Sequence, residues 1–168
     1  MTLSNINAMA HEEFVAALGG IVEHSPWVAD ATWASRPFAS VDDLHAAMMG
    51  VVSGAPEMKQ VALLRAHPEL AGKAAIRGEL TGDSTVEQSG AGLTQCSPQE
   101  FSRLTALNRA YNAKFGFPFI IAVKGLDRPS ILERFGARMD NDRATEFGEA
   151  LEQVARISRL RLAALLER

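Results

Sequence analysis

The 168-residue sequence contains only one cysteine, Cys96. A lone cysteine cannot form a disulfide within the chain, so nothing indicates the disulfide framework of small secreted proteins. No apolar run reaches about 20 residues, the length that a membrane-spanning helix needs. The 17 basic and 20 acidic residues give a net charge of −3, which does not favour a nucleic-acid or membrane partner.

Targeting signals are also missing from both ends of the chain. The first residues, Met-Thr-Leu-Ser, are not a basic segment leading into a long apolar run, so no signal peptide is predicted. The last residues, Leu-Leu-Glu-Arg, differ from the Ser-Lys-Leu ending of peroxisomal proteins. We therefore expect a cytoplasmic protein.

Sequence motifs for cofactors are lacking as well. There is no Gly-x-Gly-x-x-Gly pattern and no P-loop, so no nucleotide cofactor is predicted. His67, Glu69 and Glu87 carry groups that could ligate a hard metal ion. No His-x-x-x-His or Cys-x-x-Cys spacing accompanies them, and we expect no metal site.

The sequence contains one helical segment after another. A hydrophobic fraction of 47% provides for a sizeable core. Residues 117–123 form the one strand-like run, and without a second run to pair with they are predicted to be an extended segment. The middle, roughly 67–95, is rich in glycine and is expected to be irregular, with a short helix at 85–91. These features predict an all-α fold, a single-domain bundle of about seven to nine helices over residues 1–168.

Capping and breaking residues mark most helix boundaries. Serine and aspartate accept hydrogen bonds at helix starts, proline fits the first turn, and glycine ends many helices. Ser40, Ser97 and Asp142 are expected to cap helices, and Gly50 is expected to end one. The predicted helices span about 11–18, 27–34, 41–49, 57–66, 98–115, 129–139 and 143–166.

Arg161 interrupts the apolar face of the last predicted helix. At about 100° per residue, it lies among Val154, Ile157 and Leu165. A guanidinium in that position must find an anion, because an unpaired buried charge costs several kcal/mol. Two interpretations stay open: a structural salt bridge or snorkelling side chain, and an arginine held in a pocket for an anionic or carbonyl group.

His67 directly follows the predicted helix at 57–66. The partial negative charge at a helix C-terminus favours a protonated imidazole, which can donate a proton to a reacting atom. The alternative is a capping histidine without a chemical role.

Ser84 and Glu87 have the spacing of a capping box, in which both side chains satisfy backbone donors at a helix start. That structural interpretation needs no function. The alternative is that Glu87 orients or polarises His67, with Gln88 as a neighbouring hydrogen-bond donor.

Four segments carry recognisable patterns in order along the chain. They are 67–73 (HPELAGK), 84–93 (STVEQSGAGL), 111–124 (YNAKFGFPFIIAVK) and 141–146 (NDRATE), followed by an arginine-rich helix. From about residue 10 to the C-terminus, the sequence resembles the 2-oxo-4-hydroxy-4-carboxy-5-ureidoimidazoline (OHCU) decarboxylases.

The resemblance implies an all-α homodimer that uses no metal or organic cofactor. It implies decarboxylation of OHCU, a small ureide, to (S)-allantoin in urate degradation. It assigns the proton donor to His67, its partner to Glu87 and a further catalytic role to Arg161. The substrate-binding positions that it implies are Pro68, Ser84, Thr85, Val86, Glu87, Gln88, Phe119, Ile120, Ile121, Ala122, Val123 and Arg161.

The implied substrate carries its carboxylate next to a ring C=N, which can accept the electron pair that departing CO₂ leaves behind. We expect Arg161, Glu87 and His67 to meet in one water-poor cleft, where they anchor the substrate, position the imidazole and deliver the proton. Two other hypotheses stay open: a metal-dependent hydrolase of a ureide or hydantoin ring, and a helical binding module without catalysis.

Overall fold

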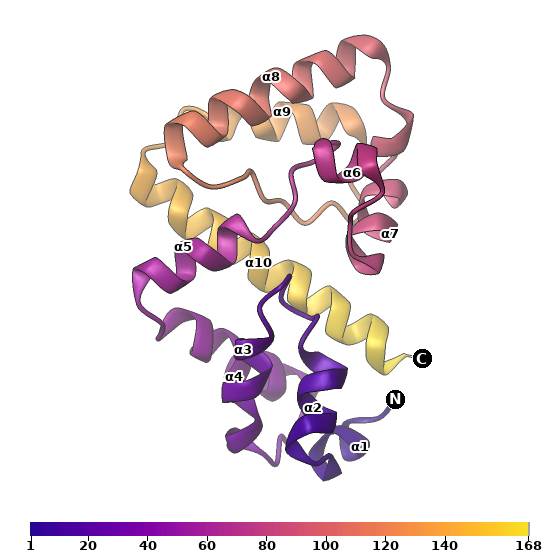
Figure 1. The fold of residues 1–168 in the computed structure, drawn as a ribbon, viewed down its shortest axis with the longest axis vertical. Coiled ribbons are helices and arrows are strands. Elements are labelled where there is room, and N and C mark those ends of the chain that lie inside the picture. Colours follow the sequence, from indigo (N-terminus) through magenta and orange to yellow (C-terminus); the bar gives the residue numbers. More distant parts are fainter. Residues whose placement is uncertain (168) are drawn as a thin grey trace. The chain divides into compact units, whose positions relative to one another are not determined.

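Every regular element in the computed structural model, which describes residues 1–167, is a helix (Figure 1). Eight of the ten α-helices in this range have seven or more residues, which agrees with the predicted number. The all-α prediction is therefore confirmed. The elements are α1 (Leu3–Ala8), α2 (His11–Leu18), α3 (Pro26–Thr32), η1 (Trp33–Ser35), α4 (Val41–Ser53), α5 (Glu57–Arg65), α6 (Lys73–Arg77), α7 (Gly82–Gly90), η2 (Leu93–Gln95), α8 (Pro98–Phe115), α9 (Arg128–Arg138) and α10 (Arg143–Leu166), where η marks a 3₁₀ helix.

The chain forms two compact units. The first contains residues 1–66 and the chain from Val154 onward, and the second contains His67–Gln153. In the first unit α3 packs against α2 and α4, and in the second α8 packs against α9 (Figure 1). Helix α10 contributes residues to both units. The single-domain assignment of residues 1–168 stays a prediction.

Several helices begin where their capping residues predict. The Ser97 hydroxyl accepts from the Glu100 amide at 3.1 Å, and the Glu100 carboxylate accepts from the Ser97 amide at 3.0 Å. Asp142 accepts from the amide of Thr145 at 2.8 Å at the start of α10. These bonds satisfy amides that have no partner inside their own helix, which is why the sequence signal is reliable.

Two helices differ from their predicted bounds by more than two residues at one end. Helix α4 continues through Gly50 to Ser53, because burial of Val52 offsets the cost of about 1 kcal/mol for a glycine inside a helix. Helix α7 begins at Gly82, and its N-cap is Thr81, whose hydroxyl accepts from the Ser84 amide at 3.3 Å. The predicted capping box at Ser84 is therefore wrong.

The glycine-rich middle contains more helix than expected, since α6, α7 and η2 all lie within it. Gly78 ends α6 with φ +70°, and Gly92 precedes η2 with φ +74°. These are left-handed conformations that glycine adopts without the steric cost of a side chain. In this part of the chain, glycine marks the ends of short helices and does not prevent helices from forming.

An aromatic cluster around Tyr111 forms much of the core of the second unit. Its ring lies 5.4 Å from the ring of Phe119 and 5.7 Å from that of Phe135, measured between centroids. The rings of Phe119 and Phe135 stack 3.8 Å apart. Residues 118–123, which carry one of these rings, belong to no helix or strand, and burial of the rings holds this run in place. Its extended conformation stays a prediction.

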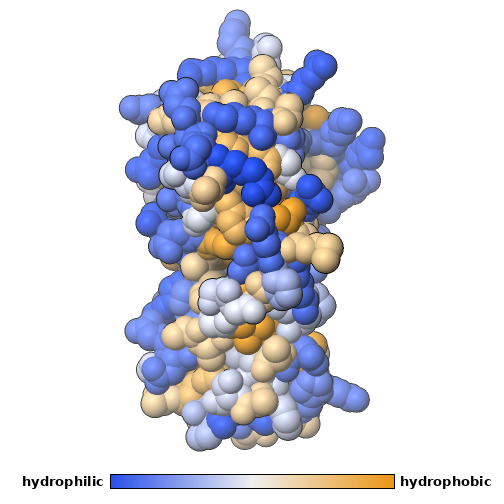
Figure 2. Space-filling model, turned by 90° about the vertical axis from the view of Figure 1, so that its left-hand side faces the viewer, coloured by the Kyte–Doolittle hydropathy of each residue, from blue (hydrophilic) through white to orange (hydrophobic). Residues whose placement is uncertain are grey.

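The surface drawn in Figure 2 is mixed, with apolar residues interspersed among hydrophilic ones. The large apolar side chains most exposed in the described range are those of Met58, Ile76 and Val86, which belong to three different helices. Within residues 1–167, no helix combines the length and apolar character that crossing a membrane requires.

Candidate active site

The segment between α5 and α6 is tied to α7 and α8 by side-chain amides. The Gln88 Oε1 atom accepts from the amide of Ala71 at 2.9 Å, and its Nε2 donates to the carbonyl of Glu69 at 3.2 Å. Asn108 donates to the carbonyl of Leu70 at 2.9 Å. These bonds satisfy backbone groups that no regular element pairs, and they fix the backbone just after the predicted catalytic histidine.

The same segment has an unusual backbone conformation. Ala71 has φ +48°, in the left-handed region that non-glycine residues avoid at a cost of about 1–2 kcal/mol. Such a conformation persists only where the surroundings hold it firmly, and such positions cluster at functional sites. His67 and Leu70, in the same segment, are both buried.

Helix α7 sorts the five predicted positions 84–88 onto two faces. Ser84 and Gln88 are buried and Glu87 is half-buried, whereas Thr85 and Val86 are exposed. Because α7 already begins at Gly82, the first three share one face at the i, i+3 and i+4 spacing. The structure therefore brings Ser84, Glu87 and Gln88 together and turns Thr85 and Val86 away from them.

Replacing Gln88 with alanine is expected to lower the free energy of unfolding by about 1–3 kcal/mol, because the Ala71 amide loses its partner and the Glu69 carbonyl loses the shorter of its two hydrogen bonds. The rate of decarboxylation should fall as well, since the segment that carries His67 loosens. Urea denaturation and steady-state kinetics measure the two effects. The control is Ser89→Ala on the exposed face of α7, and a Gln88→Ala protein as stable as that control would contradict the anchoring role.

The extended segment 119–123 is anchored by two side chains. Arg138 Nη1 donates to the carbonyl of Ile120 at 2.7 Å, and the amide of Ala122 donates to Gln153 Oε1 at 2.9 Å. In an extended chain the N–H and C=O of one residue share an edge, and those of the next residue lie on the other edge. In the predicted extended conformation, the backbone of Ile121 points away from both anchors.

Ile121 is buried, yet no hydrogen bond to any residue in the range 1–167 engages its amide or carbonyl. Buried backbone groups almost always have a partner, in the protein, in ordered water or in a ligand. An adjacent donor and acceptor are therefore available on this edge of the segment.

A buried network around Glu146 sets the position of Arg138. The Oε1 atom of Glu146 accepts from Arg138 Nε at 2.7 Å and from the Tyr111 hydroxyl at 2.5 Å. Its Oε2 accepts from Asn141 Nδ2 at 2.9 Å. Burial, together with the neighbouring carboxylate, raises the pKa of Tyr111 well above its ordinary value, so the phenol stays a donor. The network thus supports the backbone at Ile120 through Arg138.

Arg161 lies in the first unit, on the apolar side of α10, and is 7% exposed. Its Nη1 donates to the Glu23 carboxylate at 2.6 Å and to the carbonyl of Gly20 at 3.4 Å. The prediction that this guanidinium finds an anion is confirmed. Because a guanidinium has several N–H donors, the ion pair alone does not decide between a structural and a binding role.

Two other features carry no sign of chemistry. Within the described part of the chain, no group of three or more His, Cys, Asp and Glu side chains gathers as a metal site would require. Partial burial raises the pKa of the Cys96 thiol, with a further contribution from Glu100, and its Sγ donates to the carbonyl of Leu93. The thiolate, which is the reactive form, is therefore disfavoured.

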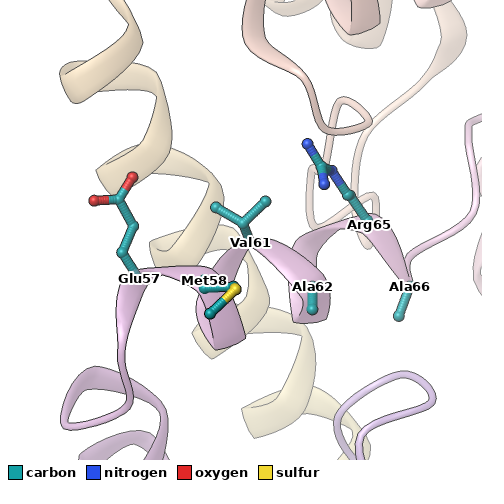
Figure 3. A pocket seen from close by; sticks show the side chains of 6 residues that line it. All are labelled: Glu57, Met58, Val61, Ala62, Arg65 and Ala66. Atoms are coloured by element: carbon teal, nitrogen blue, oxygen red, sulfur yellow. The ribbon is translucent and has the colours of Figure 1, made fainter.

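A shallow depression runs along α5 and is lined by Glu57, Met58, Val61, Ala62, Arg65 and Ala66. In Figure 3, one side of the helix carries Glu57, Val61 and Arg65, which are four residues apart. The other side carries Met58, Ala62 and Ala66. None of the predicted site residues lines this depression.

Comparison with known proteins decides the family. The family model described as OHCU decarboxylase matches residues 7–163. The chain belongs to the OHCU decarboxylase family. This confirms the predicted family and enzyme class, a carboxy-lyase, and it does not favour a metal-dependent hydrolase or a binding module.

The relatives match over nearly the whole chain. The OHCU decarboxylase of Halalkalicoccus jeotgali is 42% identical over 165 residues, which cover 98% of this chain and 92% of that protein. The enzyme of Xenopus laevis is 39% identical over 165 residues, with 98% and 94% covered. The crystal structure of (S)-allantoin synthase has a TM-score of 0.79 and 30% identity, and covers 99% of this chain and 54% of that one.

Four residues that hold the predicted site of this OHCU decarboxylase family member are not among the residues predicted from the sequence. Asn108, Arg138, Gln153 and Glu23 received no role, although each bonds to a predicted site residue or to its segment. A signal exists for one of them: Gln153 lies two helical turns before Arg161, so both are polar residues on one side of α10. The other three lie in unremarkable sequence.

Proposed function

We propose that the protein decarboxylates OHCU to (S)-allantoin in urate degradation, without a metal or organic cofactor. The near-full-length match to the OHCU decarboxylase family carries this proposal. The solved relative is named for (S)-allantoin synthesis, and we extend that product to this chain.

We assign three roles in the reaction. Arg161 binds the substrate carboxylate and stabilises developing charge, as the fork of a guanidinium suits. Glu87 positions the imidazole of His67. The bond to the carboxylate breaks, CO₂ leaves, and the electron pair enters the adjacent C=N system. His67 then gives a proton to one face of the ring, which makes a single stereoisomer.

The α7 geometry supports the role of Glu87. As a residue inside α7, Glu87 has no capping-box function that would account for it. It shares a helix face with Gln88, which bonds to the segment that begins with His67. The proposal that all three catalytic residues act in one cleft stays a prediction.

The backbone of Ile121 supports recognition of a ureide. A ureide presents N–H and C=O groups side by side in one plane, and they pair with a carbonyl and an amide on one edge of an extended segment. The anchors at Ile120 and Ala122 hold the opposite edge. We propose that residues Phe119–Val123 bind the ureide through this free edge, with Pro68 and Ser84 as further contacts.

We also propose that the enzyme is a single-domain homodimer in the cytoplasm. The dimer rests on the family resemblance, and the location rests on the single cysteine, which cannot form the internal disulfides that are typical of small secreted proteins. One family match that runs through residues 7–163 supports a single domain.

A coupled assay tests the proposed function. Urate oxidation followed by hydroxyisourate hydrolysis supplies fresh substrate, and circular dichroism follows the formation of optically active allantoin. The purified protein should release CO₂ above background and yield one enantiomer, with or without EDTA. Activity that EDTA abolishes and a divalent ion restores would favour the hydrolase instead. No CO₂ above background would favour the binding module.

A further inference from the structure

Glu23 is a buried carboxylate that the proposed mechanism does not use. It lies in the turn between α2 and α3 and is 1% exposed. Its Oε2 atom lies 2.6 Å from Nη1 of Arg161, whose side chain is 5% exposed. Both residues belong to the same compact unit. A carboxylate so completely removed from water is costly unless its charge is compensated, so the ion pair explains how Glu23 is tolerated.

The turn that carries Glu23 is tightly built. The Ser25 hydroxyl donates to the carbonyl of Glu23 at 3.0 Å, and the Ser25 amide donates to the carbonyl of Val22 at 3.1 Å. His24, directly after Glu23, has φ +46°, a left-handed conformation that a side chain disfavours. Such strain persists where surrounding contacts over-determine the backbone, and it occurs preferentially at functional sites.

Stability alone is a poor explanation for this ion pair. A buried pair loses its hydration, and replacing both partners with apolar residues is often neutral or stabilising. The same helix carries a second pair, Arg159 with Asp42 at 2.8 Å, whose side chains are 39% and 79% exposed. An ion pair on α10 can therefore form at the surface, where neither charge has to give up its hydration.

Burial of the pair can fix the orientation of the Arg161 guanidinium. An arginine side chain has many rotamers, and its planar guanidinium recognises a carboxylate only when the plane is correctly turned. A bond from Nη1 to a fixed, buried carboxylate restricts that rotation. The carbonyl of Gly20, which accepts from the same nitrogen at 3.4 Å, restricts it further.

We propose that Glu23 is a positioning residue, which holds the guanidinium of Arg161 in the orientation that binds the substrate carboxylate. This inference rests on the proposed function, in which Arg161 contacts the substrate. A displacement of a binding group by about 1 Å can cost about 10²-fold in rate, so loss of Glu23 should lower kcat/KM about 10–100-fold.

A double-mutant cycle tests this inference through the coupling of the two residues. In the otherwise wild-type enzyme, Glu23→Gln should lower kcat/KM about 10–100-fold, and Glu23→Asp, which keeps the charge, should lose less. In the Arg161→Ala enzyme, the same Glu23→Gln change should alter kcat/KM by less than about two-fold, because no guanidinium remains to be oriented. Asp42→Asn, which breaks the exposed pair on α10, is the control and should leave kcat/KM unchanged.

Two outcomes overturn the inference. If the losses from Glu23→Gln and Arg161→Ala multiply in the double variant, Glu23 acts independently of Arg161. If Glu23→Gln lowers the melting temperature but leaves kcat and KM unchanged, its role is merely structural. Should Glu23→Gln fail to fold, the same comparison is made with Glu23→Asp. A wild-type protein that releases no CO₂ contradicts the proposed function itself, whereas an active wild type with independent losses contradicts only this inference.

Discussion

Replacing His67 with asparagine is expected to lower the decarboxylation rate by about 10²–10⁴-fold while the protein stays folded. Asparagine keeps a polar side chain of similar size in this buried position, but its amide does not gain and lose a proton near neutral pH. The substrate can still bind, so kcat should fall more than KM rises. Stopped-flow circular dichroism of the coupled reaction measures both constants.

The matched control is His11→Asn. His11 is an exposed histidine on α2 that pairs with Asp30 at 2.9 Å, and it has no proposed role in the reaction. Its variant should decarboxylate at the wild-type rate. A His67→Asn enzyme that does the same would show that the imidazole is not the proton donor, and the chemistry would then need another acid.

Replacing Glu146 with alanine is expected to lower the free energy of unfolding by about 3–5 kcal/mol, because the buried guanidinium of Arg138 loses its counter-charge. The hydroxyl of Tyr111 loses its acceptor at the same time. Arg138 would also hold the carbonyl of Ile120 less firmly, so activity should fall with stability. Urea denaturation followed by far-ultraviolet circular dichroism gives the free energy.

Glu133→Ala provides the comparison for that experiment. Glu133 is an exposed residue of α9, the helix that ends with Arg138, and its loss should change the free energy of unfolding by less than about 0.5 kcal/mol. A Glu146→Ala protein that loses less than about 1 kcal/mol would mean that Arg138 and Tyr111 find other partners easily.

The two proposed substrate segments of the second unit are built in the same way. Neither the segment between α5 and α6 nor residues 119–123 belongs to a regular element, so no helix or strand ladder pairs most of their backbone groups. Side chains from helices supply those partners: Gln88 and Asn108 for the first segment, Arg138 and Gln153 for the second. This anchoring gives irregular backbone the rigidity that an active site requires.

Local signals in the sequence were sufficient for most of the longer helices and for the family, but they indicated neither α1 nor α6. Ser97 and Asp142 mark helix starts because a cap bonds to an amide three residues away, which the sequence shows directly. The short motifs around His67 and Glu87 were enough to recognise an OHCU decarboxylase. The start of α7 differs from the prediction because two residues, Thr81 and Ser84, can both cap, and packing selects between them.

What the sequence determined by itself was that Arg161 lies on an apolar helix face and must meet an anion, since a helical period and the cost of a buried charge are local facts. Only the tertiary structure decided that the anion is Glu23, 138 positions away. The same holds for Gln153, 31 positions from the amide of Ala122 that it accepts from. Partners so distant along the chain leave no periodic or capping pattern, because only folding brings them within bonding distance.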